Sequence, residues 1–273
     1  MPLEDRKKSQ NLEQVYLADN HLRAYRHTDP LNLDIDFRIP KTCGVKGQSK
    51  TDLRDKAYWT SYFGIADKVT IKPEQLGEAG VGSLCEALID PKCTVDSINL
   101  HGNKVGDVGA SCFADVLNRP NSKLVKLDLS WCNVSAKGAE ALATAIKNPD
   151  CKLVDLNLSG CHVGDEGAKF LAKAVRSKAN KVATLGLLGN KITDSGADQF
   201  SLSLQDERCK LTRLNLSSNH IDKDGATKLE RALLDPVGRK VQLNFLDNKQ
   251  RASCCSNDGL TQVCAHDFSA LGS

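Results

Sequence analysis

Apolar and polar residues alternate in a pattern that repeats along most of the chain. Segments with the order L-x-x-L-x-L-x-x-N/C-x-L begin at Val95, Leu124, Leu153, Val182, Leu211 and Val241, the last of them irregular at its start. The Asn or Cys position recurs at one constant spacing, at Asn103, Cys132, Cys161, Asn190, Asn219 and Asn248. A fixed period of this length is typical of stacked-repeat proteins, so we predict a solenoid.

The second half of each unit has the spacing of a helix. A glycine follows all but the last of these Asn or Cys positions by six residues, and apolar residues then recur four apart, as at Leu142 and Ile146. Such residues share one face of a helix. Neither half can bury its apolar face alone, so we expect stacking to form a core between a parallel sheet and a helix layer.

These residues resemble the leucine-rich repeat, and the period and the helix resemble its ribonuclease-inhibitor-like subtype. The resemblance covers about residues 66–250. It implies an α/β fold, a right-handed solenoid or horseshoe with a parallel β-sheet on the concave face and α-helices on the convex face. The Asn side chains are then expected to hydrogen-bond the backbone of adjacent coils. Cys132 and Cys161 would do so only weakly, through S–H.

A second period, twice the first, supports the subtype. Cys93, Cys151 and Cys209 lie two repeat lengths apart, in DPKC, NPDC and DERC, whereas the intervening units have RPNS and SKAN. Ribonuclease inhibitors also alternate two repeat types, and this chain is similar.

We expect three parts in the chain: an N-terminal cap with an irregular first repeat and an insertion (1–65), leucine-rich repeats of 29 residues (66–250), and a C-terminal cap helix and tail (251–273). The first part contains a predicted strand at 31–39 and a predicted helix at 51–64 that carries four aromatic residues. Two interpretations stay open for residues 23–65, a cap over the end of the core or an insertion that binds a partner.

Composition narrows the class of protein. Lys and Arg number 37 and Asp and Glu 34, a net charge of +3, which argues against nucleic acid as the partner. The N-terminal stretch lacks the apolar core of a signal peptide, and no apolar run has the length of a membrane span. Together with the odd number of cysteines, 11, this favours reduced thiols. We therefore expect a cytoplasmic monomer that does not bind membranes.

No motif indicates catalysis, so we expect no catalytic residues, no cofactor and no enzyme activity. The group most suggestive of a metal site is Cys254, Cys255, Cys264 and His266. Its spacing differs from that of structural zinc sites, and we predict no metal.

The concave face is the predicted binding surface, because such solenoids present it to macromolecules. Trp131 is expected to stand there between Gly102 and Gly160, exposed as a binding hot spot. The alternative is that Trp131 folds down over the turn or is covered by a terminal segment. Outward positions also include Ser130 and Ser217. The predicted protein-binding residues are His101, Asp128, Trp131, Asn157, His162, Leu188, Arg213, Asn215 and His220.

These observations lead to a non-enzymatic module that binds a protein on its concave face. The resemblance implies an inhibitor or regulator of an enzyme as the subtype, without naming the target. Two alternatives remain. One is a GTPase-activating protein of the leucine-rich-repeat type, although the arginine of that family has no equivalent here. The other is a bacterial effector, or a regulator of another effector, that acts in a host cell.

Overall fold

The computed structural model describes residues 67–71, 73, 76–234, 241–246 and 248 in full. Of the remaining chain it describes the backbone of three short strands, β1 (Val15–Tyr16), β2 (Arg23–Arg26) and β3 (Asn32–Asp36). The predicted helix at 51–64, the predicted cap helix after 250 and the Cys254–His266 group lie outside the described residues.

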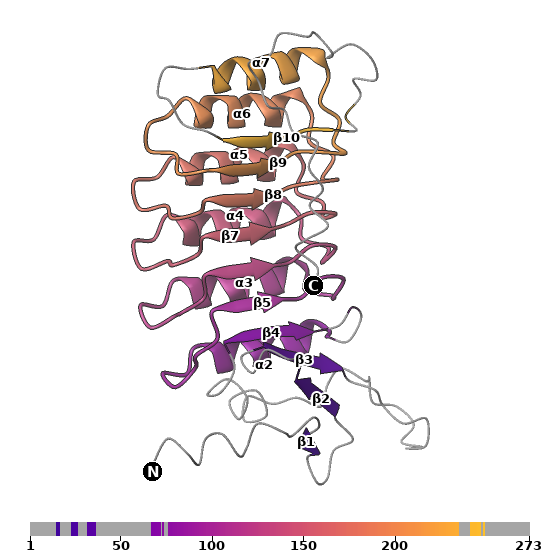
Figure 1. The fold of residues 1–273 in the computed structure, drawn as a ribbon, viewed down its shortest axis with the longest axis vertical. Coiled ribbons are helices and arrows are strands. Elements are labelled where there is room, and N and C mark those ends of the chain that lie inside the picture. The colour runs from indigo at the N-terminus through magenta and orange to yellow at the C-terminus, as the bar shows by residue number, and fades with distance from the viewer. Residues whose placement is uncertain are drawn as a thin grey trace.

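Strands and helices alternate in the described chain. The strands are β4 (Lys68–Ile71), β5 (Ser97–Asn99), β6 (Lys126–Asp128), β7 (Asp155–Asn157), β8 (Thr184–Gly186), β9 (Arg213–Asn215) and β10 (Gln242–Asn244). The helices are α2 (Glu78–Leu88), α3 (Gly106–Leu117), α4 (Ala136–Ile146), α5 (Gly164–Val175), α6 (Asp194–Leu204) and α7 (Lys223–Leu233). Figure 1 shows them as two layers, with the strands stacked in front of the helices. The predicted α/β leucine-rich-repeat solenoid is confirmed.

The sheet runs in chain order from β1 to β10, and every pair from β3 onward is parallel. Strand residues pair with residues one repeat further on: Leu127 lies beside Leu156, and Leu156 beside Leu185. Each of these leucines is at most 1% exposed. Residues one sequence period apart therefore pair in the sheet, as expected.

The first three strands depart from this pattern. β1 pairs with β2, and β2 with β3, in the antiparallel direction. The strands of the repeats pair in parallel, so β1 and β2 differ from them in direction. β3 falls within the strand predicted at 31–39, whereas β2 was not predicted.

Helices pack closely on one another because small residues lie at their contacts. A Cβ atom added to Gly138 on α4 would meet Asp107 Oδ1 at 2.7 Å and Ala110 Cβ at 3.0 Å, both from α3. Glycine at the equivalent position of the other helices, at Gly109, Gly167, Gly196 and Gly225, lets neighbouring helices approach in the same way.

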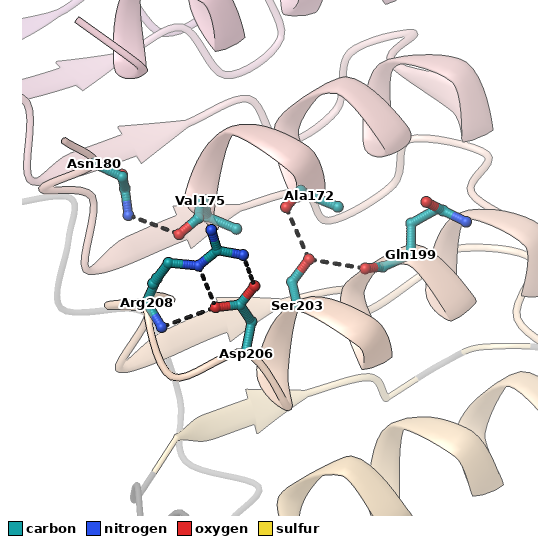
Figure 2. Close-up of polar contacts among 7 residues, drawn as sticks. All are labelled: Ala172, Val175, Asn180, Gln199, Ser203, Asp206 and Arg208. Carbon is teal, nitrogen blue, oxygen red and sulfur yellow. Dashed lines mark hydrogen bonds and ion pairs between the residues drawn. The ribbon is translucent and has the colours of Figure 1, made fainter. Parts of the chain in front are cut away.

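Polar groups at the helix ends and in the return loops bond to neighbouring backbone (Figure 2). Ser203 Oγ on α6 lies 2.8 Å from the carbonyl oxygen of Ala172 on α5. Asn180 Nδ2 donates to the carbonyl of Val175, where α5 ends, at 3.1 Å. In the next return loop, the guanidinium of Arg208 donates to both carboxylate oxygens of Asp206, with N–O distances of 2.9 and 2.7 Å. The Ser203 contact thus joins two neighbouring helices and the Asn180 contact fixes a loop to the end of α5, whereas the Arg208–Asp206 pair stays within its own loop.

Within the described residues, no helix is long and apolar enough to cross a membrane. The same residues contain no group of His, Cys, Asp and Glu side chains arranged to hold a metal ion.

Candidate protein-binding face

The sheet face opposite the helices is called the open face below. Of the nine predicted binding residues, Asp128, Asn157, Arg213 and Asn215 lie in its strands, and the other five lie in the segments that follow the strands. The side chains of His101, Trp131, His162, Arg213 and His220 are exposed. Those of Asp128, Asn157, Leu188 and Asn215 are half-buried. Ser130 and Ser217, expected to face outward, are each only 4% exposed because neighbouring side chains cover them.

A ladder of side-chain amides lies directly beneath the open face. Asn103 Oδ1 accepts from the backbone N–H of Leu76 at 2.8 Å, and its Nδ2 donates to the carbonyl of Ile71 at 3.0 Å. Asn190, Asn219 and Asn248 make equivalent bonds to the preceding repeat. The predicted role of these Asn residues is confirmed.

Thiols replace the amides at two successive positions of this ladder. Cys132 Sγ lies 3.0 Å from the carbonyl of Leu100, and Cys161 Sγ lies 3.3 Å from that of Leu129. Burial raises the pKa of Cys132 to about 12, so it stays protonated and donates. The thiols thus make the donor half of the amide contact, as expected.

Three of the predicted binding residues support the fold at the ends of their strands. Asp128 Oδ1 accepts from the N–H of Ser130 at 2.8 Å, and Asn157 and Asn215 bind the N–H two residues on in the same way. Asn157 Nδ2 also donates to Asp128 Oδ2 at 3.1 Å. These Asx turns direct the chain out of each strand, a structural role that the sequence analysis missed.

Trp131 is the most prominent side chain of the open face. It is 58% exposed, the largest value on this face among the described large apolar side chains. Its φ is +58°, a left-handed conformation that bulky residues rarely adopt. The equivalent turn positions are Gly102, Gly160 and Gly189, with φ between +65° and +69°, and Ser218, with φ +53°.

The indole ring lies over Gly160 in the next repeat. A Cβ atom added to Gly160 would fall 2.4 Å from the ring atoms Cδ2 and Cε2 of Trp131. Trp131 is thus exposed, as the first interpretation has it, and its ring also lies down on the next turn, as the alternative has it, on a site that only glycine leaves open.

The histidines lie along the edge of the open face. His101 Nδ1 is 2.8 Å from Ser130 Oγ, so its ring reaches across to the next repeat. His162 and His220 are exposed and lie in the same phase as Lys104 and Lys191. This edge is rich in cationic and titratable groups.

A charged row crosses the middle of the face, where Lys126, Asp155, Thr184 and Arg213 are neighbours in register. Burial raises the pKa of Asp155, and the positive charges of Lys126 and Arg213 partly offset this. Arg213 Nε donates to Thr184 Oγ1 at 3.2 Å. The open face thus combines an exposed aromatic ring with mixed charges.

Four stretches of the chain match a family model described as Leucine Rich repeat, at residues 92–114, 121–143, 150–172 and 208–229. Each stretch begins in a return loop, includes the next strand and ends within the following helix, in register with the structural unit. These four stretches are leucine-rich repeats.

No curated protein sequence matches the chain significantly. Among solved structures, actin-binding site 2 of leiomodin-1 is similar, with 16% identity and a TM-score of 0.43, over 51% of this chain and 78% of that one. An internalin of Listeria monocytogenes is also similar, with 16% identity and a TM-score of 0.41, over 72% of this chain and 52% of that one. The chain therefore spans about half the length of that internalin chain.

The leucine-rich repeats also carry a capping system that the sequence analysis missed. Asp107, in the first turn of α3, accepts at Oδ1 from the N–H groups of Ser135 and Gly138 at 2.7 and 3.0 Å, and at Oδ2 from the Ser135 hydroxyl at 2.6 Å. Asp165 on α5 binds Thr193 and Gly196 in the same way. A carboxylate of one repeat thus caps the helix of the next.

Asp107 and Asp165 lie two repeats apart, but Asp194, one repeat after Asp165, also accepts at Oδ1 from the N–H of Asp222 at 2.7 Å, just before α7. The Gly-Asp pairs at 106–107 and 164–165 were the signal in the sequence. Both glycines have left-handed backbone, with φ +62° and +58°. The cap itself does not alternate, because Asp165 and Asp194 make it in successive repeats.

Proposed function

We propose that this leucine-rich-repeat chain is a non-enzymatic module that binds a protein partner on the concave, open face of its sheet, with Trp131 as the anchor. The observation that carries the proposal is an exposed indole held in left-handed backbone where three equivalent turns have glycine. Such a conformation costs about 1–2 kcal/mol, and the indole buries only part of its surface against Gly160 in return, since Trp131 is 58% exposed. Exposed aromatic anchors of this kind dominate protein interfaces.

The surroundings of Trp131 support a protein as the partner. Leu188 on the same face adds apolar area, and His101, His162, Arg213 and His220 supply polar groups around it. Asp128, Asn157 and Asn215 are half-buried polar groups that bind in their turns, and Asp128 and Asn157 also bond to each other. An apolar centre with a polar rim is the usual composition of a protein interface.

We further propose a repeat subtype, a regulatory role and a cellular compartment for the module. The repeats would be of the ribonuclease-inhibitor-like subtype, and the module would inhibit or regulate an enzyme. The helix in each repeat and the alternation of two repeat types support the subtype. We place the module in the cytoplasm as a monomer, with residues 1–65 and 251–273 as caps. Its 11 cysteines suit a reducing compartment.

An affinity capture with three immobilised proteins tests the anchor: the wild type, Trp131→Gly and Leu202→Ala. Leu202 lies on α6, is 50% exposed and serves as the matched apolar control on the helix face. We expect the wild type and Leu202→Ala to retain the same protein and Trp131→Gly to lose it, with an affinity lower by about 30-fold or more, the range of a hot spot of about 2 kcal/mol.

Equal retention by Trp131→Gly would remove Trp131 from the interface. Loss of the partner with Leu202→Ala alone would move the interface to the helix layer. Circular dichroism of all three proteins establishes that the fold is unchanged.

A further inference from the structure

Asp128, Ser130 and His101 form one hydrogen-bonded chain that crosses from one repeat to the repeat before it. Ser130 Oγ donates to Asp128 Oδ1 at 2.5 Å, and His101 Nδ1 lies 2.8 Å from the same serine oxygen. Ser130 is 4% exposed, so water has little access to its hydroxyl, whereas the His101 side chain is exposed. The buried end of the chain therefore determines how an exposed imidazole is presented.

Backbone N–H groups fix the direction of the hydrogen bonds at the buried end. The N–H of Ser130 donates to Asp128 Oδ1 at 2.8 Å, which makes that oxygen an acceptor. The N–H of Ser159 donates to Asn157 Oδ1 at 3.1 Å in the same way. Asn157 therefore turns its Nδ2 toward Asp128 Oδ2, at 3.1 Å. The carboxylate of Asp128 thus receives three donors, and the hydroxyl of Ser130 is one of them.

The tautomer of His101 follows from this chain. A serine hydroxyl carries one proton, and that of Ser130 is directed to Asp128. Ser130 Oγ can then only accept from the imidazole, so Nδ1 of His101 is the nitrogen that carries a proton. In the neutral ring the other nitrogen, Nε2, is unprotonated and accepts hydrogen bonds. A histidine side chain free in water prefers the opposite arrangement, with its proton on Nε2.

The other histidines of the described chain lack this arrangement. The rings of His162 and His220 are exposed and make no hydrogen bond to the described residues. Ser217, equivalent to Ser130, donates to Asn244 Oδ1 at 2.6 Å, but the residue one repeat before it is Leu188. The fixed imidazole is therefore a feature of this one site among the described repeats and is not required by their architecture.

We propose that His101 is a second recognition residue of the open face and presents Nε2 to the partner as a hydrogen-bond acceptor. This inference rests on the proposed function, because it concerns the same partner as Trp131. Ser130, Asp128 and Asn157 are positioning residues, which act on the partner only through the imidazole. The partner is a protein segment that places an apolar side chain on the indole and an N–H or O–H donor at the imidazole.

The position of His101 suits this role. Its ring contacts Ser130, the residue directly before Trp131, so the acceptor and the apolar anchor are close together. The backbone is held as well, because the N–H of His101 donates to Asn99 Oδ1 at 2.9 Å. A ring fixed before binding loses little freedom in the complex. While the imidazole is neutral, a partner carboxylate at Nε2 would set two acceptors against each other, so the site selects a donor.

Nitrogen-15 NMR of the full chain tests the tautomer without knowledge of the partner. Two-bond correlations between ring protons and ring nitrogens show which nitrogen carries a proton, and comparison with His101→Gln identifies the His101 signals. At alkaline pH, where imidazoles are neutral, we expect His101 to hold its proton on Nδ1. His162 and His220 should favour Nε2. A proton on Nε2 of His101 would overturn the proposal.

Two serine variants test the positioning role. Ser130→Ala removes the oxygen that accepts from Nδ1 and should move the proton of His101 to Nε2. Ser195→Ala changes an exposed serine on α6 and should leave the proton on Nδ1. An unchanged tautomer in folded Ser130→Ala would contradict the role of the hydroxyl. The wild-type spectrum decides the tautomer even where Ser130→Ala fails to fold.

Affinities for the protein retained in the Trp131 capture test the role of the acceptor. His101→Lys, which can only donate, should bind about tenfold more weakly than the wild type, the effect of one lost hydrogen bond. His101→Gln, whose amide oxygen can accept, should lose less affinity than His101→Lys. Wild-type affinity in His101→Lys would overturn the acceptor and leave the anchor intact. Full retention by Trp131→Gly with loss in His101→Lys would overturn the anchor alone.

Discussion

At the scale of single residues, Trp131 occupies a turn whose backbone conformation favours glycine. Gly102, Gly160 and Gly189 occupy equivalent turns with left-handed backbone, which glycine adopts without strain. Trp131 adopts the same conformation with a large side chain that stays 58% exposed. The strain is local, since the backbone N–H of Trp131 still donates to the carbonyl of Ser159 at 2.8 Å.

The first prediction compares Trp131 with its counterpart two repeats further on. Trp131→Gly should leave the free energy of unfolding unchanged within about 1 kcal/mol or raise it, because relief of the left-handed strain offsets the lost contact with Gly160. Gly189→Ala should lower it by about 1 kcal/mol, since an added Cβ there meets only atoms at 3.9 Å and suffers the strain alone. Urea unfolding of both variants is the measurement. A loss of more than about 2 kcal/mol in Trp131→Gly, the range for truncation of a packed side chain, would make the indole a packing element.

The sequence predicted part of this picture. The phase of Trp131 within the repeat placed it on the open face between two glycines, and that holds. The left-handed backbone was not predicted, because tryptophan gives no signal for it. The burial of Ser130 was missed because it depends on where the His101 ring lies, 2.8 Å away in the preceding repeat.

At the scale of elements, each helix start depends on the repeat before it. Ser135 precedes α4, accepts from the N–H of Lys137 at 3.3 Å, and is itself bound by Asp107 from α3. The N-terminal N–H groups of α4 are thereby satisfied by two repeats together. Neighbouring repeats therefore stabilise one another through such hydrogen bonds as well as through apolar packing.

The second prediction removes one of these caps. Asp107→Ala should lower the free energy of unfolding by about 1–2 kcal/mol at neutral pH. Glu140→Ala, an exposed acid on α4, should change it by less than about 0.5 kcal/mol. Equal effects of the two variants in urea unfolding would contradict the capping role.

The effect of Asp107 should depend on pH in a defined direction. Partial burial would raise the pKa of Asp107, but hydrogen bonds from Ser135 and Gly138, with the charge of Lys137, outweigh it and hold the pKa below its ordinary value. The carboxylate therefore stabilises the fold at a pH above about 4, the pKa in the unfolded chain. The difference between the wild type and Asp107→Ala should shrink as the pH falls below that value. A difference that grows in acid would contradict the assignment.

At the scale of the whole molecule, the ladder beneath the open face sets how strongly repeats join. The period of Asn and Cys positions predicted the fold, the register and this ladder. Side chains that recur at a constant spacing occupy equivalent places in stacked repeats, so they are expected to make equivalent hydrogen bonds. The antiparallel strands β1 and β2 could not be predicted in the same way, since they share no period with the repeats. The Asp107 cap escaped notice because it joins two repeats that differ in sequence.

The third prediction exchanges two members of the ladder. Cys161→Asn should raise the free energy of unfolding by about 1 kcal/mol, because an amide there can still donate to the carbonyl of Leu129 and can also accept from Val134 N–H. The reciprocal change, Asn190→Cys, should lower it by a similar amount, since Asn190 Oδ1 accepts from Val163 N–H at 3.1 Å. A loss of stability in Cys161→Asn would show that the site has no room for the amide.

The conformation of residue 131 also bears on how such a surface changes over generations. The codons for tryptophan and glycine, UGG and GGG, differ in one base. A turn that accepts both residues without refolding places the presence or absence of a binding anchor one mutation apart. Recognition at this position can be gained or lost while the inherited architecture of the repeats stays as it is.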